Sequence, residues 1–282
     1  MKTSDWSLTP SVRAISRLFY CGIIFHFLSL FLLADEPILA KDQEWGDLTG
    51  RFLFDGPPPK PMEVRIDKDE KFVKEPIYSE SLVVDAKTRG IANVLLRLMP
   101  NEDAVLRIHS DYEKDQKEPV TMSVTGFRFH PHIALVRTGQ PFVIRCKDPV
   151  GHNPKVDYFN NSNFSEIAPF NGTYQRVLSK PESYPSPISC SVHPWETGWV
   201  MVQDHPYMAL TVPTGEFTLK NLPVGKHKFC VWHETCGFVT KATLDGRKQE
   251  WKKGRIELDI KPGRNDLGDI IVPGEILKRK DK

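Results

Sequence analysis

The sequence has little of what enzymes, nucleic-acid-binding proteins and haem proteins usually carry. It contains no serine–histidine–aspartate motif, no glycine-rich phosphate loop, no paired acid motif and no Cys-x-x-Cys-His haem sequence, so enzyme chemistry has no positive support. No segment repeats its apolar residues with a sustained helical period. The 38 basic and 36 acidic residues are interspersed and leave a net charge of +2, which excludes a field strong enough to gather nucleic acid.

Cysteine is also scarce, with five residues in 282. Cys21 lies in an N-terminal apolar segment, and the other four are Cys146, Cys190, Cys230 and Cys236. In an oxidising compartment four cysteines suggest two disulfides, an interpretation that competes with a metal-bound Cys190. If Cys190 is a ligand, Cys230 could pair with Cys236, or Cys146 with either of them. Free buried thiols are the other alternative.

The first forty residues differ in composition from the rest. Arg13 and Arg17 precede an apolar run from Leu18 to Ala34, and the segment ends in small residues at Ala40, which is the layout of a secretory signal. An uncleaved anchor is the alternative, because the run is near the lower length for spanning a bilayer. With either form of residues 1–40, we expect export to the periplasm or cell envelope, and membrane contact only through an uncleaved segment.

The one local charge bias is the C-terminal tail, residues 276–282, which ends in Lys278-Arg279-Lys280-Asp281-Lys282. A short solvated terminus is the simpler interpretation. Docking to an acidic partner or a membrane surface is the alternative.

After Ala40 the sequence predicts short β-strands separated by turns. Apolar and polar residues alternate in 142–147 and 198–202. Proline and glycine, 23 and 18 in number, interrupt the chain between such segments. This pattern predicts an all-β sandwich or barrel. The expected strands of the first part are 48–54, 81–85, 92–98, 120–129, 133–137, 142–147 and 199–203.

Residues 153–188 interrupt this pattern with a polar stretch rich in asparagine, serine and proline. The composition predicts a long surface loop. Loops of this length inside a compact domain tend to be functional, and this one separates the two halves of the site described below.

From residue 204 onward a second β pattern begins, in which two successive hairpins carry glycine in their turns. We expect residues 41–203, with the N-terminal strands included, to form one domain and residues 204–275 a second, smaller β unit. The expected strands of the second unit are 207–212, 216–220, 227–233, 237–244, 254–260 and 266–272.

Two short segments carry residues suited to one metal ion. Cys190 and His193 lie three residues apart, a spacing that lets a tight loop fold around an ion. Earlier in the chain, two strands joined at a glycine turn lead to the pair His152-Asn153, and such a strand pair gives a ligand a rigid base. A soft thiolate with two imidazoles in a trigonal plane suits copper. Together the two segments strengthen the case for a metal site.

On these residues the segment 120–203 resembles the cupredoxins, the blue-copper fold. Its loop from Cys190 to Glu196 is most similar to that of amicyanin-type proteins. The wider chain resembles bacterial envelope proteins labelled methylamine-utilisation-like. The resemblance implies a Greek-key cupredoxin-like β-sandwich in which His152, Cys190 and His193 are the three equatorial ligands of a single copper ion. It also implies that Asn153 is a hydrogen-bonding residue around the metal.

The same resemblance implies a surface for electron transfer. In cupredoxins the second histidine of the sequence typically faces the surface that meets redox partners. Carried over by position, His193 would be exposed there, and Pro194 and Trp195 would form an apolar rim around it.

Glu196 departs from the resembled pattern, because amicyanin-like loops carry an axial methionine three residues after the second histidine. A bound carboxylate is a harder ligand that should stabilise Cu(II), lower the potential and favour a more tetrahedral site that could also take zinc. If Glu196 points away, the axial position is open or filled by a backbone oxygen. Met201 and Met208 are also available in sequence, but we expect Met201 in the core.

Further histidines allow a second metal site. His205, His233 and Glu234 offer imidazoles and a carboxylate that suit zinc or copper, with satisfied structural histidines as the alternative. His109 and His227 are expected to be exposed.

Residues 215–229 resemble the carboxypeptidase regulatory-like, transthyretin-like module, which is usually non-catalytic and serves stability or binding. The sequence as a whole favours an electron carrier with a redox protein partner. An envelope binding or scaffold protein with a structural or vestigial metal site is the alternative. An oxidase or copper-delivery role would need a second metal or an open coordination position.

Overall fold

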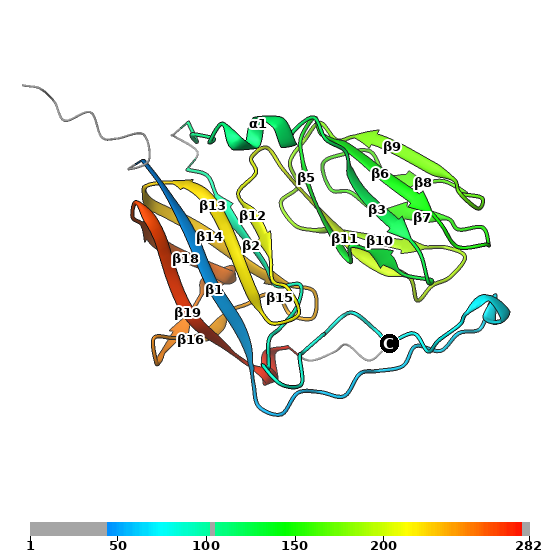
Figure 1. Ribbon diagram of the computed structural model, residues 1–282, viewed down its shortest axis with the longest axis horizontal. Coiled ribbons are helices and arrows are strands. Elements are labelled where there is room, and N and C mark those ends of the chain that lie inside the picture. The colour runs from blue at the N-terminus through cyan, green and yellow to red at the C-terminus, as the bar shows by residue number, and fades with distance from the viewer. Residues whose placement is uncertain (1–43, 102–104, 278–282) are drawn as a thin grey trace, which may run out of the picture. The chain divides into compact units, whose positions relative to one another are not determined.

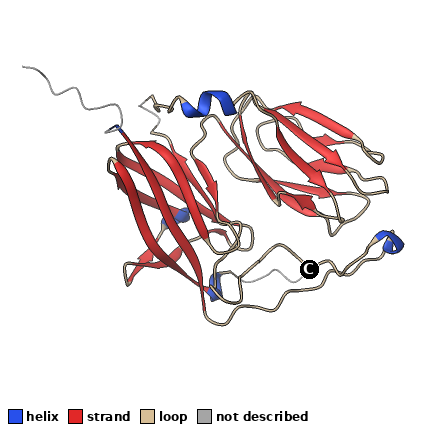
Figure 2. Ribbon diagram, viewed as in Figure 1, coloured by secondary structure: helices blue, strands red, loops and turns tan. Residues whose placement is uncertain are grey.

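The computed structural model describes residues 44–101 and 105–277, and these are nearly all β-strand and loop (Figure 1, Figure 2). The all-β prediction is therefore confirmed. The expected signal or anchor and the basic residues from 278 onward lie outside the described residues. Within the described part of the chain, no helix combines the length and apolarity needed to cross a membrane.

Residues 120–203 form a β-sandwich, here called the central sandwich, around one apolar core that includes Met122, Phe142 and Val200. Its first sheet is ordered β4 (Phe129–His130), β3 (Val120–Val124), β6 (Pro141–Cys146) and β9 (Thr173–Val177). Its second sheet is ordered β5 (Ile133–Arg137), β11 (Thr197–Gln203), β10 (Ser186–Cys190), β7 (Pro154–Val156) and β8 (Phe164–Ser165). A short helix, α1 (Asp111–Asp115), precedes it.

A second set of strands forms the terminal sandwich around its own core, which includes Phe52, Leu96 and Phe229. One sheet is ordered β13 (Glu216–Pro223), β1 (Trp45–Asp55), β19 (Gly263–Pro273), β16 (Lys241–Leu244) and β17 (Arg247–Glu250). The other is ordered β12 (Met208–Leu210), β2 (Leu95–Met99), β14 (Gly225–His233) and β15 (Gly237–Phe238), with β18 (Arg255–Ile260) also paired to β14. The described residues also include the 3-10 turns η2 (Glu70–Phe72), η3 (Lys252–Gly254) and η4 (Gly274–Ile276).

The strand pairing groups the N-terminal strands differently from the expected boundary at residue 203. β1 pairs antiparallel with β13 and parallel with β19, and β2 pairs with β12 and β14. Alternation along a strand shows which face is buried, but it does not show which distant strand completes the hydrogen bonds. The central sandwich is thus inserted between β2 and β12 of the terminal sandwich.

The prediction that residues 153–188 form a long loop is wrong, because this stretch contains β7, β8, β9 and the start of β10. These strands have two to five residues, and four of the five residues of β9 are exposed. Short strands with mostly polar, exposed side chains lack the apolar alternation from which a strand is recognised in a sequence.

Two other strand predictions also differ. Residues 81–85 form only an isolated bridge between Val84 and Ile91. The expected strand 120–129 is broken at Gly126 and Phe127, which both have positive φ angles, of 58° and 57°. Such angles do not fit a strand, so β3 and β4 are separated by a turn.

All four cysteines of the described residues are free thiols, so the alternative with disulfides is not the one that the structure shows. Cys146 and Cys190 lie in the core of the central sandwich. Cys230 lies on β14 of the terminal sandwich, and Cys236 is half-buried in the turn between β14 and β15. Free buried thiols, one of the two alternatives, describe the structure. Met201 is fully buried in a small apolar cluster, as expected.

Gly215 provides a test of the pairing between β1 and the strands that follow residue 204. It has a φ of +85°, and a Cβ atom at this position would lie 2.2 Å from the carbonyl oxygen of Phe52. We expect Gly215→Ala to lower the free energy of unfolding by more than about 2 kcal/mol, because a strained angle and a backbone clash act together.

The matched control is Gly246→Ala, since Gly246 has a φ of +70° but nothing within 4 Å of an added Cβ. We expect it to lose about 1 kcal/mol from backbone strain alone. Urea unfolding measures both values. Equal losses in the two variants would contradict the close approach between Gly215 and β1.

Candidate metal centre

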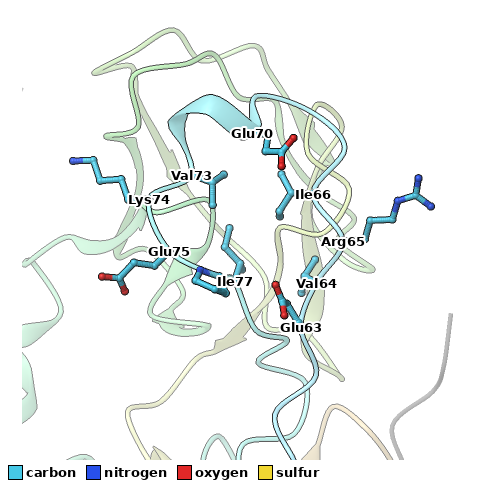
Figure 3. A pocket seen from close by; sticks show the side chains of 10 residues that line it. Glu63, Val64, Arg65, Ile66, Glu70, Val73, Lys74, Glu75 and Ile77 are labelled. Carbon is cyan, nitrogen blue, oxygen red and sulfur yellow. The ribbon is translucent and has the colours of Figure 1, made fainter.

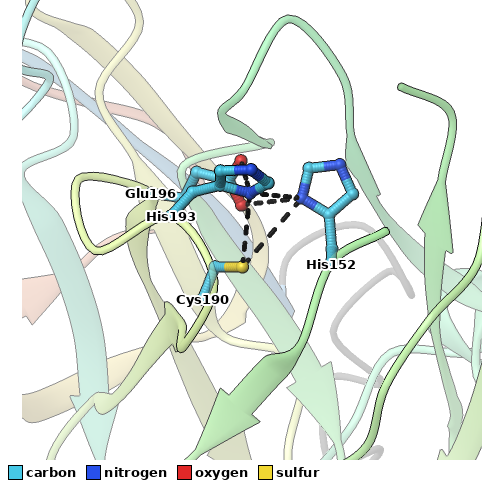
Figure 4. Close-up of side chains that lie close together, drawn as sticks. All are labelled: His152, Cys190, His193 and Glu196. Carbon is cyan, nitrogen blue, oxygen red and sulfur yellow. Dashed lines mark hydrogen bonds and ion pairs between the residues drawn. The ribbon is translucent and has the colours of Figure 1, made fainter. Parts of the chain in front are cut away.

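Three of the predicted ligands come from the loop that joins β10 to β11. Cys190 is the last residue of β10, and its N–H donates to the Glu196 carbonyl at 3.1 Å. The N–H of Glu196 donates to the His193 carbonyl at 2.9 Å. These two bonds close residues 190–196 into a compact turn, and the side chains of Cys190, His193 and Glu196 lie together (Figure 4).

His152 reaches the same point from the residues before β7. It exchanges two backbone hydrogen bonds with Ala168, of 2.8 and 2.7 Å, which hold its backbone on both sides. β7 pairs with β10 so that Pro154 lies opposite Cys190. This register brings the imidazole of His152 beside the ligand loop (Figure 4).

The distances among the four side chains fit a single ion. The two Nδ1 atoms of His152 and His193 are 3.2 Å apart, and they lie 4.0 and 3.7 Å from Sγ of Cys190. The carboxylate oxygens of Glu196 lie 3.1 Å from Nδ1 of His152 and 3.2 Å from Nδ1 of His193. Ligand atoms about 2.0–2.3 Å from one ion in tetrahedral or trigonal geometry are about 3.3–4.0 Å apart. The structure therefore brings all four together, Glu196 included.

The cluster is closed to solvent. Cys190 is 2% exposed, Glu196 is 1% exposed, and both histidines are fully buried. The carboxylate of Glu196 faces the Nδ1 atoms of the two imidazoles inside this closed cluster. A buried carboxylate without full compensation is costly, and a metal cation would supply the missing charge.

The charges in the cluster also fit a cation. Burial, with the nearby Glu196 carboxylate, raises the pKa of Cys190 to about 11. Burial alone would raise the pKa of Glu196, but hydrogen bonds with His152 and His193 outweigh it and hold that pKa below its ordinary value. The carboxylate is therefore ionised at neutral pH, whereas the thiol keeps its proton until a cation replaces it.

Asn153 contacts the centre through its backbone. Its N–H points to Sγ of Cys190 at 3.4 Å, and its carbonyl accepts the N–H of Ser191 at 3.1 Å. Its side-chain oxygen accepts the Ser165 hydroxyl at 3.0 Å. Asn153 thus ties the His152 segment to the ligand loop, and the hydrogen bond near the sulfur comes from the main chain.

The expectation that His193 faces the surface is wrong. Its side chain is fully buried, and its Nε2 lies 3.0 Å from Oδ2 of Asp69. The rings of Phe127 and Trp195 lie 5.1 and 5.2 Å from its ring, measured between centroids. Pro194 is exposed and Trp195 is only partly buried, so the expected rim exists without an exposed histidine inside it.

Asp69 belongs to residues 56–80, here called the arm, which follow β1 in the chain (Figure 1). The N–H of Val64 donates to the Ile77 carbonyl at 2.8 Å, and the N–H of Ser79 donates to the Met62 carbonyl at 2.9 Å. These bonds pair the two sides of the arm and leave Asp69 and η2 near its end. Side chains from the two sides line an open hollow with a volume of about 370 Å³, and Figure 3 shows these side chains. Sequence reasoning missed Asp69, because it lies 124 residues from His193 in a segment without a regular pattern.

The residues of the expected second site are not brought together. Among residues 44–101 and 105–277, the only cluster of three or more side chains suited to a metal ion is the one that contains His152. Nδ1 of His205 accepts the N–H of Tyr207 at 3.2 Å, and Nδ1 of His233 lies 2.9 Å from the Thr235 hydroxyl. Both histidines are buried, and Nδ1 of each has a local hydrogen-bond partner, which favours a structural role for them.

Glu234 binds side chains of the central sandwich instead of a metal-ligand group. It accepts the indole N–H of Trp199 at 3.0 Å and forms a short contact with Nε2 of His132. The prediction that His109 and His227 are exposed is wrong, because both are half-buried. The edge of His109 packs on Trp45, and Nε2 of His227 donates to a backbone carbonyl at 2.7 Å.

No protein-family model matches this chain, and no curated protein does either. Among solved structures, it is similar to a copper-containing nitrite reductase from Thermus scotoductus SA-01, with 19% identity over 38% of this chain and 25% of the reductase, at a TM-score of 0.28. It is also similar to a purple cupredoxin from Nitrosopumilus maritimus, with 21% identity over 29% of this chain and 98% of that one, at a TM-score of 0.25. A Cu(I) form of an amicyanin variant shares 14% identity over 30% of this chain and 81% of its own, at a TM-score of 0.27. The chain thus spans about a quarter of the nitrite reductase, and each likeness covers only part of it.

The buried His233 provides a pH test. Burial lowers its pKa from 6.5 to about 4, so it is neutral in the folded protein when the unfolded chain already binds a proton. Stability is therefore complete above pH 6.5 and is lost as the pH falls toward 4. We expect this residue to contribute a loss of about 2 kcal/mol between pH 6.5 and 5. The free energy of unfolding, measured by urea titration at several pH values, should fall less steeply for His233→Gln. Equal slopes in the two proteins would contradict the assignment.

Proposed function

We propose that this chain binds one copper ion through His152, Cys190, His193 and Glu196 and carries electrons. The observation that carries the proposal is the spacing of four buried donor atoms, which all lie within 4.8 Å of one another. A thiolate and two imidazoles are the donors that suit copper. When bound, copper supplies a one-electron couple, and the chain's own part is to hold the donors and exclude water.

The structure of the ligand loop supports a role without large rearrangement. Cys190 and Glu196 are linked by a backbone hydrogen bond, and His152 is held by Ala168. Donors on such fixed backbone do not need to move when the charge at the centre changes by one unit. This supports an electron carrier over a site that opens to bind a substrate.

The proposal extends to an exported protein without enzymatic activity that meets a redox protein partner. Export rests on Arg13 and Arg17 before the apolar run 18–34. The absence of enzyme activity rests on the four donors, which are enough to fill a tetrahedral site and leave no position for a substrate.

A second candidate is a binding or scaffold protein in which the metal, such as zinc, is structural. Glu196 favours it, because a carboxylate is a hard ligand that suits zinc as well as Cu(II). The burial of His193 favours it too, because the imidazole that would meet a partner is covered by Asp69. Strong thermal stabilisation by zinc, together with no reversible potential of the copper form, would identify this role.

The copper spectrum tests thiolate ligation. Copper loading should produce a thiolate-to-copper absorption band in the visible range, and Cys190→Ser should remove it. Cys236→Ser is the control, because Cys236 lies in the terminal sandwich, and this variant should keep the band. A colourless copper-loaded wild type that never changes redox state would refute the electron carrier.

Glu196→Met tests whether the carboxylate binds the metal. Replacing a charged oxygen donor by a thioether removes stabilisation of a dication. The substitution should therefore raise the copper potential and weaken zinc binding by more than about tenfold. Voltammetry and zinc competition measure them. An unchanged potential with unchanged zinc affinity would show that Glu196 is not a ligand.

A further inference from the structure

We propose that Asp69 is a positioning residue of the metal centre, which the arm delivers to the outer side of His193. Its carboxylate fixes the proton of the imidazole on Nε2 and keeps Nδ1 free to bind the ion. The inference rests on the proposed function, because it concerns the same four ligands. It adds a residue that lies outside the central sandwich and outside the ligand loop.

The contact between Asp69 and His193 has the geometry of a hydrogen bond. Oδ2 of Asp69 lies 3.0 Å from Nε2 of His193, and the other ring nitrogen faces His152 and Cys190 at 3.2 and 3.7 Å. A carboxylate accepts hydrogen bonds, so the imidazole proton belongs on Nε2. A metal-bound histidine whose other nitrogen donates to a carboxylate is held in one tautomer and orientation and is a more basic ligand.

The burial of the contact distinguishes it from an ordinary surface ion pair. The His193 side chain is 0% exposed, and the Asp69 side chain is 27% exposed. Without Asp69, the N–H of a buried ring would lose its acceptor, which is costly in a way that loss of an exposed pair is not. The rings of Phe127 and Trp195 contact other parts of the same imidazole and offer no replacement acceptor.

The arm holds the Asp69 backbone in place. The carbonyl of Asp69 accepts the N–H of Phe72 at 2.9 Å, which closes the turn at η2. Asp69 has a φ of 57°, a left-handed conformation that aspartate tolerates better than most residues. The paired sides of the arm, through Val64 and Ile77, make this turn part of a hairpin-like unit. The carboxylate is therefore presented by an ordered segment.

The negative charge of Asp69 should make the site bind divalent ions more tightly relative to Cu(I). A thiolate at Cys190 and the Glu196 carboxylate already balance a dication. Asp69 adds a further negative charge behind one imidazole, and Asp148 lies 3.6 Å from Nε2 of the other, His152. Asp148 also accepts two backbone N–H groups, at 2.7 and 2.9 Å, whereas Asp69 reaches its histidine at the shorter distance. Asp69 should thus strengthen binding of Zn(II) and Cu(II) more than that of Cu(I).

Zinc affinity in the full chain tests the inference without any redox step. We expect Asp69→Ala to weaken Zn(II) binding by about 10–100-fold, the usual loss when a residue behind a metal-bound histidine is removed. Asp69→Asn keeps an acceptor oxygen but loses the charge, so its affinity should lie between those of Asp69→Ala and the wild type. Asp67→Asn is the matched control, because Asp67 is an exposed carboxylate on the same arm, and it should bind as the wild type does.

Nitrogen-15 spectra of histidine in the metal-free protein give a second readout that does not depend on metal binding. The wild type should show His193 protonated on Nε2 with a slowly exchanging proton, and Asp69→Ala should lose that slow exchange. If the wild type binds neither zinc nor copper, the proposed function fails while these spectra still test Asp69. Should Asp69→Ala not fold, Asp69→Asn keeps the zinc comparison.

Copper potentials measure the charge preference directly. If Asp69→Asn weakens Cu(II) tenfold more than Cu(I), its one-electron potential rises by about 59 mV. Zinc affinities of both Asp69 variants equal to that of Asp67→Asn would overturn the inference. Unchanged His193 spectra in Asp69→Ala would overturn it as well.

Discussion

The burial of an ionised carboxylate among two imidazoles and a thiol is the constraint on which the centre depends. Glu196 is 1% exposed, and its pKa stays below the ordinary value only because His152 and His193 lie against it. An unpaired charge in such a place costs several kcal/mol, which is comparable to the whole free energy of unfolding of a typical domain. Compensation comes from protons on the imidazoles or from a cation, and both require the rings to be held where they are. The turn at 190–196 and the bridge between His152 and Ala168 meet that requirement.

This constraint couples metal binding to protons. Burial raises the pKa of Cys190 to about 11, so its thiol gives up a proton when it becomes a ligand. Around His193 burial alone would lower the pKa, but Glu196 and Asp69 outweigh it and raise that pKa. The metal-free cluster is therefore stabilised by protons at the positions that a dication would take. Metal binding at such a cluster should therefore release protons from these groups.

The sequence predicted which donor side chains cluster better than it predicted their surroundings. Cys190, His193 and Glu196 lie within seven residues, so a single turn brings them together, and strand 133–137 was predicted with its observed bounds. Asp69 could not be found in this way, because no local pattern links it to a residue 124 positions away. The partners of β1 were hidden for a similar reason, since hydrogen bonding between strands leaves no trace in either strand's composition. The burial of His193 was missed as well, because Asp69 and Phe127, which lie beside its ring, are distant from it in sequence.

The arm lies between β1 and β2, which are both strands of the terminal sandwich. The arm leaves the end of β1, and the chain then returns to β2, so the terminal sandwich holds the segment at both ends. The central sandwich supplies the four donors, whereas the chain between β1 and β2 supplies Asp69. A central sandwich alone would contain the ligands but would leave Nε2 of His193 without its carboxylate. The terminal sandwich therefore contributes to the surroundings of the four donors, because it holds both ends of the segment that carries Asp69.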